Sequence, residues 1–289
     1  MKKMLTYCLF LFVLFGCDSS DQKEDYTTPT TPKLAKQILN EHYGPDDQQV
    51  MDIYLPKGRN ALLTKVFVVV HGGGWYSGDK ADLNFIVVYL KTKFPEAAII
   101  NLNYRLGTLS SIGYPKQVQD IQAAIQYMND RTQEYDVSRQ YAMIGFSAGA
   151  HLSMLYAYRH DSAHQVKAVC SMVGPSDFSD PSYAEKRDLF DTGLPYFVGD
   201  YPNYESNPLL YNEISPATYI NLFTPKTLLI YGSKDNLVPA TQGEILHNKL
   251  SQFLVYNEFY QLDMGHTDCT EQQMDEIKDR MTNFFNLAF

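Results

Sequence analysis

A serine framed by glycines stands between a predicted strand and a predicted helix. Residues 145–149 read Gly-Phe-Ser-Ala-Gly, with Ser147 at the centre. The apolar run over residues 141–144 is typical of a buried strand, and residues 150–155 favour a helix. A sharp strand-to-helix turn needs small neighbours and lifts its serine above the edge of a sheet, where the start of the helix favours developing negative charge. The pattern predicts Ser147 as a nucleophile.

A second glycine-rich segment follows another apolar run. Residues 71–75 read His-Gly-Gly-Gly-Trp, directly after a strand predicted over residues 65–70. Successive glycines let the backbone approach a substrate closely and turn N–H groups toward it, as a tetrahedral oxyanion requires. We expect Gly73 and Gly74 to donate, together with Ala148. A packing turn or a phosphate-binding loop are the alternatives, but the chain has neither a Walker lysine nor a G-x-G-x-x-G spacing.

A serine nucleophile of this kind needs an acid and a histidine, which follow it in that order along the chain. A strand predicted over residues 227–231 leads to Asp235, and one predicted over residues 254–262 leads to His266. We expect His266 to be the general base and Asp235 to orient it. Asp177 is the alternative acid. The other candidates are less well placed in helices or loops: His151, His160, His164, His247 and Asp263.

Strands alternate with helices over most of the chain and would position these residues. Residues 116–128 show helical spacing, with Val118, Ile121 and Ile125 on one face. The alternation predicts a three-layer α/β fold, a mainly parallel sheet with helices on both faces, and a hairpin-like antiparallel edge before residue 65. The predicted strands cover residues 49–55, 65–70, 97–103, 141–146, 166–173, 227–231 and 254–262.

Residues 178–220 interrupt this alternation after the sixth strand. The segment is long, aromatic and punctuated by Pro and Gly. An insertion of this length is usually a lid or a substrate-facing region, and a surface excursion without function is the alternative. We expect this insertion and the loops around Trp75 to shape the substrate pocket.

The N-terminal residues differ from the rest. Two lysines precede an apolar run that ends at residue 15, which is typical of a secretory signal over residues 1–16 and short for a membrane span. Residues 14–17, Leu-Phe-Gly-Cys, resemble a bacterial lipobox, although Phe15 is larger than usual. Lipidation of Cys17 would anchor an exported chain to a membrane, in the periplasm or on the outer-membrane face. A cleaved signal or an uncleaved anchor are the alternatives. Residues 17–33 read as a disordered tether, and residues 34–289 as the catalytic domain.

Composition excludes several classes of function. The formal net charge is −9 and no stretch is rich in Lys or Arg, which argues against a nucleic-acid partner. No His/Cys spacing typical of a metal site is present, so we expect neither a metal nor a cofactor. Of the four cysteines only Cys170 and Cys269 would remain in the exported domain, and we expect them to be free thiols.

Together these motifs resemble those of bacterial α/β-hydrolase esterases related to the hormone-sensitive lipases, closest to the acetyl-xylan and feruloyl esterase-like branch. The resemblance covers nearly the whole domain, from residues 51–56 to Gly265 and His266. It implies a triad and an oxyanion hole, and it places Trp75 on the acyl side of the pocket. The residues implied are Ser147, Asp235 and His266 for the triad, and Gly73, Gly74 and Ala148 for the oxyanion hole.

The chain departs from these relatives in two respects. No long helical cap precedes the sheet, so the cleft would be open to bulky esters, and Ala150 stands where a glycine is common. The resemblance implies hydrolysis of short-chain or carbohydrate-linked acyl esters, acetyl or feruloyl, through an acyl-serine intermediate. The substrate would be a small-molecule or oligosaccharide ester. An arylformamidase-like or peptidase-like amide hydrolase is the alternative. A non-catalytic binding protein is less favoured, because all three triad residues are present.

Overall fold

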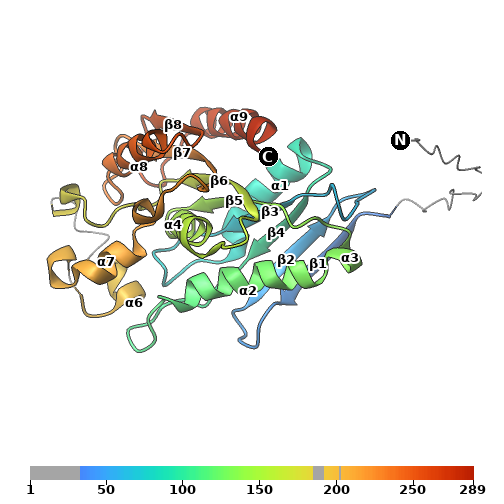
Figure 1. Ribbon diagram of the computed structural model, residues 1–289, viewed down its shortest axis with the longest axis horizontal. Helices are drawn as coiled ribbons and strands as arrows, with labels where there is room; N and C mark the ends of the chain where they lie inside the picture. The colour runs from blue at the N-terminus through green and yellow to red at the C-terminus, as the bar shows by residue number, and fades with distance from the viewer. Residues whose placement is uncertain (1–32, 185–191, 202) are drawn as a thin grey trace, which may run out of the picture. The chain divides into compact units, whose positions relative to one another are not determined.

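An eight-stranded sheet forms the centre of the computed structural model, which describes residues 33–184, 192–201 and 203–289 (Figure 1). The strand order is β1-β2-β4-β3-β5-β6-β7-β8. Six neighbouring strands, β4, β3, β5, β6, β7 and β8, run parallel to one another. Strand β2 pairs antiparallel with both β1 and β4. The strands are β1 (Lys36–His42), β2 (Val50–Leu55), β3 (Val66–Val70), β4 (Ala98–Leu102), β5 (Tyr141–Phe146), β6 (Val166–Met172), β7 (Lys226–Gly232) and β8 (Asn257–Leu262).

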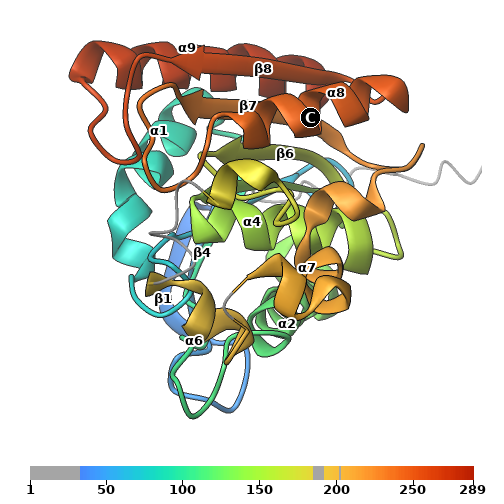
Figure 2. The ribbon, with the colours of Figure 1, turned by 90° about the vertical axis from the view of Figure 1, so that its left-hand side faces the viewer.

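Helices cover both faces of this sheet, which confirms the predicted three-layer fold (Figures 1 and 2). Alternate residues of β3 divide between two apolar clusters, because successive side chains of a strand point to opposite faces. Val68 belongs to the cluster on the face covered by α2 (Lys116–Asp130), α4 (Ala148–Leu155) and α8 (Thr241–Gln252). Phe67 packs with α1 (Asn84–Lys93) and α9 (Glu271–Ala288) on the other face. The shorter helical segments on this part of the chain are η1 (Lys80–Leu83), α3 (Thr132–Tyr135) and the π-helical η2 (Tyr156–His160).

Most predicted strands match the structure to within a residue or two. The largest difference is at β8, which was predicted to begin at Leu254 and begins at Asn257. Leu254 has a positive φ of 58° and is 90% exposed. A left-handed backbone conformation is incompatible with a strand, so the chain turns at Leu254 before the strand starts.

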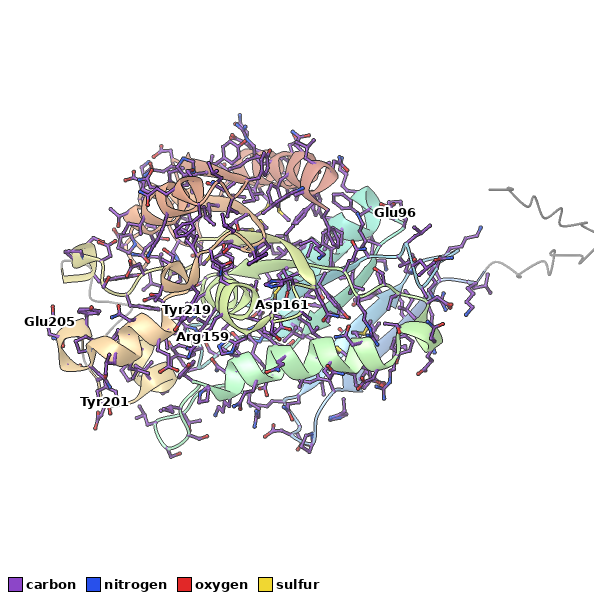
Figure 3. All side chains as sticks on the ribbon, in the orientation of Figure 1. Glu96, Arg159, Asp161, Tyr201, Glu205 and Tyr219 are labelled. Carbon is purple, nitrogen blue, oxygen red and sulfur yellow. The ribbon has the colours of Figure 1, made fainter. Side chains whose placement is uncertain are left out.

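The insertion after β6 is packed into the core where the structure describes it. It contains η3 (Pro181–Ala184), α6 (Leu194–Val198), η4 (Tyr204–Ser206), α7 (Pro208–Ile214) and η5 (Pro216–Tyr219). Arg159 at the end of η2 donates to the Glu213 carbonyl and carboxylate, and its guanidinium lies over the Tyr219 ring at 4.9 Å (Figure 3). The side chains of Phe178, Phe197 and Tyr211 are fully buried. The described insertion is therefore part of the molecule's core and not a loose surface excursion.

The compact unit that contains the sheet runs from Pro32 to Phe289. The predicted signal peptide, Cys17 and nearly all of the tether fall within residues 1–32, outside the described residues. Within the described part of the chain, no helix has the length and apolar character needed to cross a bilayer.

Candidate active site

Ser147 occupies a strained turn between β5 and α4. Its φ and ψ are 52° and −119°, a conformation that non-glycine residues rarely adopt. A Cβ on Gly145 would lie 2.4 Å from the Gly149 carbonyl oxygen, and one on Gly149 would lie 2.2 Å from the Val70 carbonyl oxygen. Only glycine fits at both positions, because the strand, the turn and the helix approach each other this closely. The local structure therefore matches the predicted strand–serine–helix turn.

His266 joins Ser147 to Asp235 in one hydrogen-bonded line. The Nε2 atom of His266 lies 2.8 Å from Ser147 Oγ, and its Nδ1 atom lies 2.7 Å from Asp235 Oδ2. The other carboxylate oxygen of Asp235 accepts the N–H groups of Leu237 and Val238, both at 2.8 Å. Asp235 is 1% exposed and Ser147 is 5% exposed. With Nδ1–H donated to the carboxylate, Nε2 is left to accept the serine proton.

The other candidate acids and bases lie elsewhere. Asp177 accepts from Ser179 in its own turn, and Asp263 pairs with Lys234 at the surface. His247 contacts Asn257. His151 is fully buried, and its ring nitrogens bond Trp75 and Ile214 and not Ser147 Oγ. The structure thus brings Asp235 and His266 to Ser147, and none of these alternatives.

The glycine loop between β3 and η1 lies against the serine turn. A Cβ on Gly72 would lie 3.3 Å from Ser147 Cβ. Gly73 and Gly74 have φ values of +102° and +59°, so the loop depends on glycine here. Among the described residues, the N–H groups of Gly73, Gly74 and Ala148 have no backbone acceptor, and Ala148 is the first residue of α4, where helix N–H groups lack partners. Their assignment as oxyanion donors stays a prediction.

His71 holds the start of this loop. Its ring stacks on Tyr104 with centroids 4.3 Å apart, and its Nδ1 lies 2.7 Å from the Gly72 carbonyl oxygen, to which it donates. The Tyr104 hydroxyl donates to the carbonyl oxygens of His71 and Gly72 at 3.0 and 3.2 Å. Burial lowers the pKa of His71, so the ring is neutral and serves as a fixed hydrogen-bonding group.

Trp75 does not line a substrate pocket, and the expectation that it does is corrected. Its side chain is 0% exposed and stacks on Phe197 with centroids 4.9 Å apart. The indole Nε1 donates to His151 Nδ1 at 3.1 Å, and the Trp75 carbonyl accepts from Gln117 Nε2 at 2.6 Å. The physical reason is that the indole finds its partners in the core, where it stacks on Phe197 and bonds His151, and the backbone of Trp75 holds a positive φ of 68° in this arrangement.

His151 connects three parts of the fold. Its Nε2 donates to the Ile214 carbonyl oxygen at 2.7 Å, while its Nδ1 accepts from Trp75. Burial lowers the pKa of His151 to about 4, so the ring stays neutral at physiological pH. The two hydrogen bonds of the His151 ring link the glycine loop, helix α4 and the insertion. The sequence ranked His151 below His266 as a candidate base but did not reveal its partners, because Trp75 and Ile214 are distant in the chain.

A cavity of about 380 Å³ adjoins the triad. Gly72, Gly73, Phe146 and His266 border it on the side of the triad. Its remaining walls are largely apolar and come from η1, the ends of β6 and β8, and the start of α9, which sequence reasoning did not single out: Leu83, Met172, Met264, Met274 and Ile277. Among the described residues, none from the insertion lines this cavity, although the insertion was expected to shape the pocket.

The cysteines and the possible metal ligands of the described residues are arranged as follows. Cys170 and Cys269 are free thiols, Cys170 buried and Cys269 partly exposed. In residues 33–184, 192–201 and 203–289, no group of three or more His, Cys, Asp or Glu side chains is arranged to hold a metal ion.

The family comparison agrees with this geometry. The BD-FAE family model matches residues 51–250, more than half of the chain. The chain belongs to the BD-FAE family. The matched region includes the glycine loop, Ser147 and Asp235, and it ends before His266.

Among curated proteins, this BD-FAE member is similar to Esterase LipC of Mycobacterium tuberculosis, with 24% identity over 220 residues, or 72% of this chain and 53% of LipC. It is also similar to arylacetamide deacetylase of Oryctolagus cuniculus, with 26% identity over 188 residues, or 59% of this chain and 47% of that protein. The chain therefore spans about half the length of the curated relatives it matches.

Among solved structures, a truncated carbohydrate esterase from gut microbiota has a TM-score of 0.71 at 23% identity, covering 86% of this chain and 96% of that one. An acetyl ester-xyloside bifunctional hydrolase from Caldicellulosiruptor lactoaceticus has a TM-score of 0.66 at 18% identity, covering 82% and 88%. These likenesses, with those to arylesterase and esterase B, confirm the α/β-hydrolase fold.

Proposed function

We propose that the chain is a serine carboxylic-ester hydrolase. The observation that carries this proposal is the line from Ser147 Oγ through His266 to the buried Asp235 carboxylate, with distances of 2.8 and 2.7 Å. A weak nucleophile is activated by an adjacent base that a third group orients, and these three side chains are arranged in that way.

The reaction has two steps. Ser147 Oγ attacks the ester carbonyl carbon while its proton passes to His266 Nε2, and the oxyanion forms near the N–H groups of Gly73, Gly74 and Ala148. The carbon–oxygen bond to the alcohol then breaks, and the imidazolium returns the proton to the leaving oxygen. Water attacks the acyl-serine, again giving its proton to His266, and the acid departs as Ser147 is regenerated. Asp235 stabilises the imidazolium throughout.

The substrates proposed are short-chain or carbohydrate-linked acyl esters, with acetyl and feruloyl as candidate acyl groups. Support comes from the esterase name of LipC and from the carbohydrate esterase and acetyl ester-xyloside hydrolase among the similar structures. The partner would be a small-molecule or oligosaccharide ester.

Amide hydrolysis is the second candidate, favoured by the similarity to arylacetamide deacetylase. The same triad can attack an amide, but the leaving amine must be protonated before it departs. We expect the protein to hydrolyse p-nitrophenyl acetate and to leave p-nitroacetanilide nearly unchanged. Faster turnover of the anilide than of the ester would reverse this order of candidates.

The nucleophile is tested by a fluorophosphonate probe, which reacts with activated serines. Mass spectrometry of peptides should locate the adduct on Ser147 in the wild type, and the Ser147→Ala variant should carry no adduct. An adduct at another serine, retained in Ser147→Ala, would contradict the assignment.

We also propose that the chain is exported as a lipoprotein anchored through Cys17, in the periplasm or on the outer-membrane face. The support is the sequence pattern of residues 2–17 alone. Expression in a bacterium fed an alkyne fatty acid should label the wild type and not Cys17→Ala. Equal labelling of both would refute lipidation at Cys17.

A further inference from the structure

The cavity beside His266 bears on the class of ester that the enzyme takes. The imidazole of His266 and the ring of Phe146 both line it, with their centroids 5.6 Å apart. Gly72 and Gly73 of the glycine loop also line it. The cavity volume of about 380 Å³ lies within the usual range for small-molecule sites. It therefore has room for one arm of an ester whose carbonyl lies at Ser147.

The chemistry of the triad decides which arm lies there. In the tetrahedral intermediate, the carbon carries Ser147 Oγ, an oxyanion, the leaving oxygen and the acyl group. The oxyanion faces the glycine loop, and the leaving oxygen must lie at His266 Nε2, because that atom returns its proton. The acyl group takes the fourth direction, away from both. A cavity walled by His266 and by Met264 and Cys269 of the same loop is thus on the alcohol side.

The walls select the chemistry of that alcohol. Leu83, Met172, Met264, Met274 and Ile277 present aliphatic and thioether groups, and Phe85 adds a ring. Among the described lining residues, Asp82 is the one carboxylate, and there is no Lys or Arg. An anionic alcohol would meet a carboxylate and no cation, and a polyol would find few partners for its hydroxyls.

We propose that this cavity is the leaving-group pocket and that it takes an apolar aryl or alkyl alcohol. The inference rests on the proposed ester hydrolase function and narrows it: in a carbohydrate-linked ester the sugar is the leaving alcohol, so aryl and alkyl esters would fit this pocket better than esters of sugars. Thioether side chains adapt their shape and contact aromatic rings favourably, so the pocket suits both aryl and alkyl groups.

Two isomeric esters test which arm occupies the pocket. Hexyl acetate carries its long chain on the alcohol, and ethyl hexanoate carries it on the acid. The full-length wild type should hydrolyse hexyl acetate with the higher kcat/KM. Met274→Trp, which fills the pocket, should lower kcat/KM for hexyl acetate by about tenfold and change that for ethyl hexanoate by less than about twofold. Val88→Trp is the matched control, since Val88 is 65% exposed on α1 and does not line the cavity.

Chemical modification of Cys269 provides a second test that needs no folded tryptophan variant. Benzyl methanethiosulfonate should attach a ring to this partly exposed thiol, whereas Cys170 is fully buried. Hydrolysis of hexyl acetate should fall after modification and recover with dithiothreitol. Each protein is compared with itself before and after the reagent, and Cys269→Ser should show no such loss.

The outcomes separate this proposal from the proposed function. If Met274→Trp and Cys269 modification instead impair ethyl hexanoate selectively, or impair neither ester, the leaving-group assignment is overturned. Loss of both activities in Ser147→Ala would show in that case that the ester hydrolase assignment still holds. Unchanged hydrolysis in Ser147→Ala would overturn the function itself.

Discussion

The indole Nε1 of Trp75 donates a hydrogen bond to Nδ1 of His151 over 3.1 Å. This bond joins the loop that carries Gly73 and Gly74 to the helix that begins immediately after Ser147. Gly73 and Gly74 adopt positive φ without steric cost, but Trp75 holds a disfavoured left-handed conformation with φ 68°, which this bond helps to maintain. We therefore propose that Trp75 and His151 are positioning residues that support the glycine loop from the core.

Replacing Trp75 with Phe should remove the donor and keep most of the packing. The buried Nδ1 of His151 would lose its partner, which costs about 1–3 kcal/mol of stability. We expect a lower kcat with little change in KM, because a displaced loop would stabilise the transition state less well than in the wild type and bind the substrate as before. Thermal unfolding and steady-state kinetics measure both effects. A variant with wild-type kcat would show that the loop holds its shape without this bond.

The buried His151 should also make folding stability depend on pH. Its folded pKa of about 4 lies below the ordinary value of 6.5. Between these values the unfolded chain binds a proton at His151 that the folded chain excludes, so the stabilisation is full above pH 6.5 and is lost as the pH falls toward 4. The loss is about 3 kcal/mol.

Urea unfolding of the wild type and of His151→Gln across this pH range measures the effect. The variant keeps a donor for the Ile214 carbonyl and lacks the titrating group, so its stability should fall less steeply. His71 also has a pKa lowered by burial and contributes equally to both proteins. Parallel pH profiles would contradict the placement of a neutral His151 in the core.

How far the sequence predicted this site depends on how local each signal is. The turn at Ser147 was predicted because strand, serine, glycines and helix are contiguous, and Asp235 and His266 because each follows a strand. Trp75 was misjudged because its burial is decided by His151, 76 positions away, and by Phe197 in the insertion. The cavity wall was not predicted for the same reason: Leu83, Met172 and Met274 are far apart in the sequence and are brought together only by the fold.

The glycine loop offers a matched pair of substitutions. Gly73 and Gly58 both have positive φ, +102° and +67°, but a Cβ on Gly73 would lie 2.1 Å from the Ser77 carbonyl oxygen, whereas one on Gly58 would meet nothing within 4 Å. Gly58→Ala should cost about 1 kcal/mol of stability and leave kcat unchanged. Gly73→Ala should also displace the loop and lower kcat about 100-fold. Equal kcat values for the two variants would argue against a role of this loop in catalysis.

Asp235→Asn should impair catalysis through the tautomer of His266. An amide that donates to Nδ1 would leave Nε2 protonated and unable to accept from Ser147, and kcat should fall roughly 10³- to 10⁴-fold. Asp263→Asn is the control, because Asp263 is exposed, pairs with Lys234 and lies three residues before His266. Comparable kcat values for both variants would mean that Asp235 does not orient the histidine.

The most direct test of the central claim compares p-nitrophenyl acetate hydrolysis by the wild type and by Ser147→Ala at neutral pH. Ser147 Oγ lies 2.8 Å from His266 Nε2, and its removal leaves the histidine with no hydroxyl to activate. We predict turnover by the wild type and a loss of at least about 10³-fold in kcat for the variant, with the fold retained by circular dichroism. Equal rates for the two proteins would contradict the assignment of Ser147 as the nucleophile and of the chain as a serine esterase.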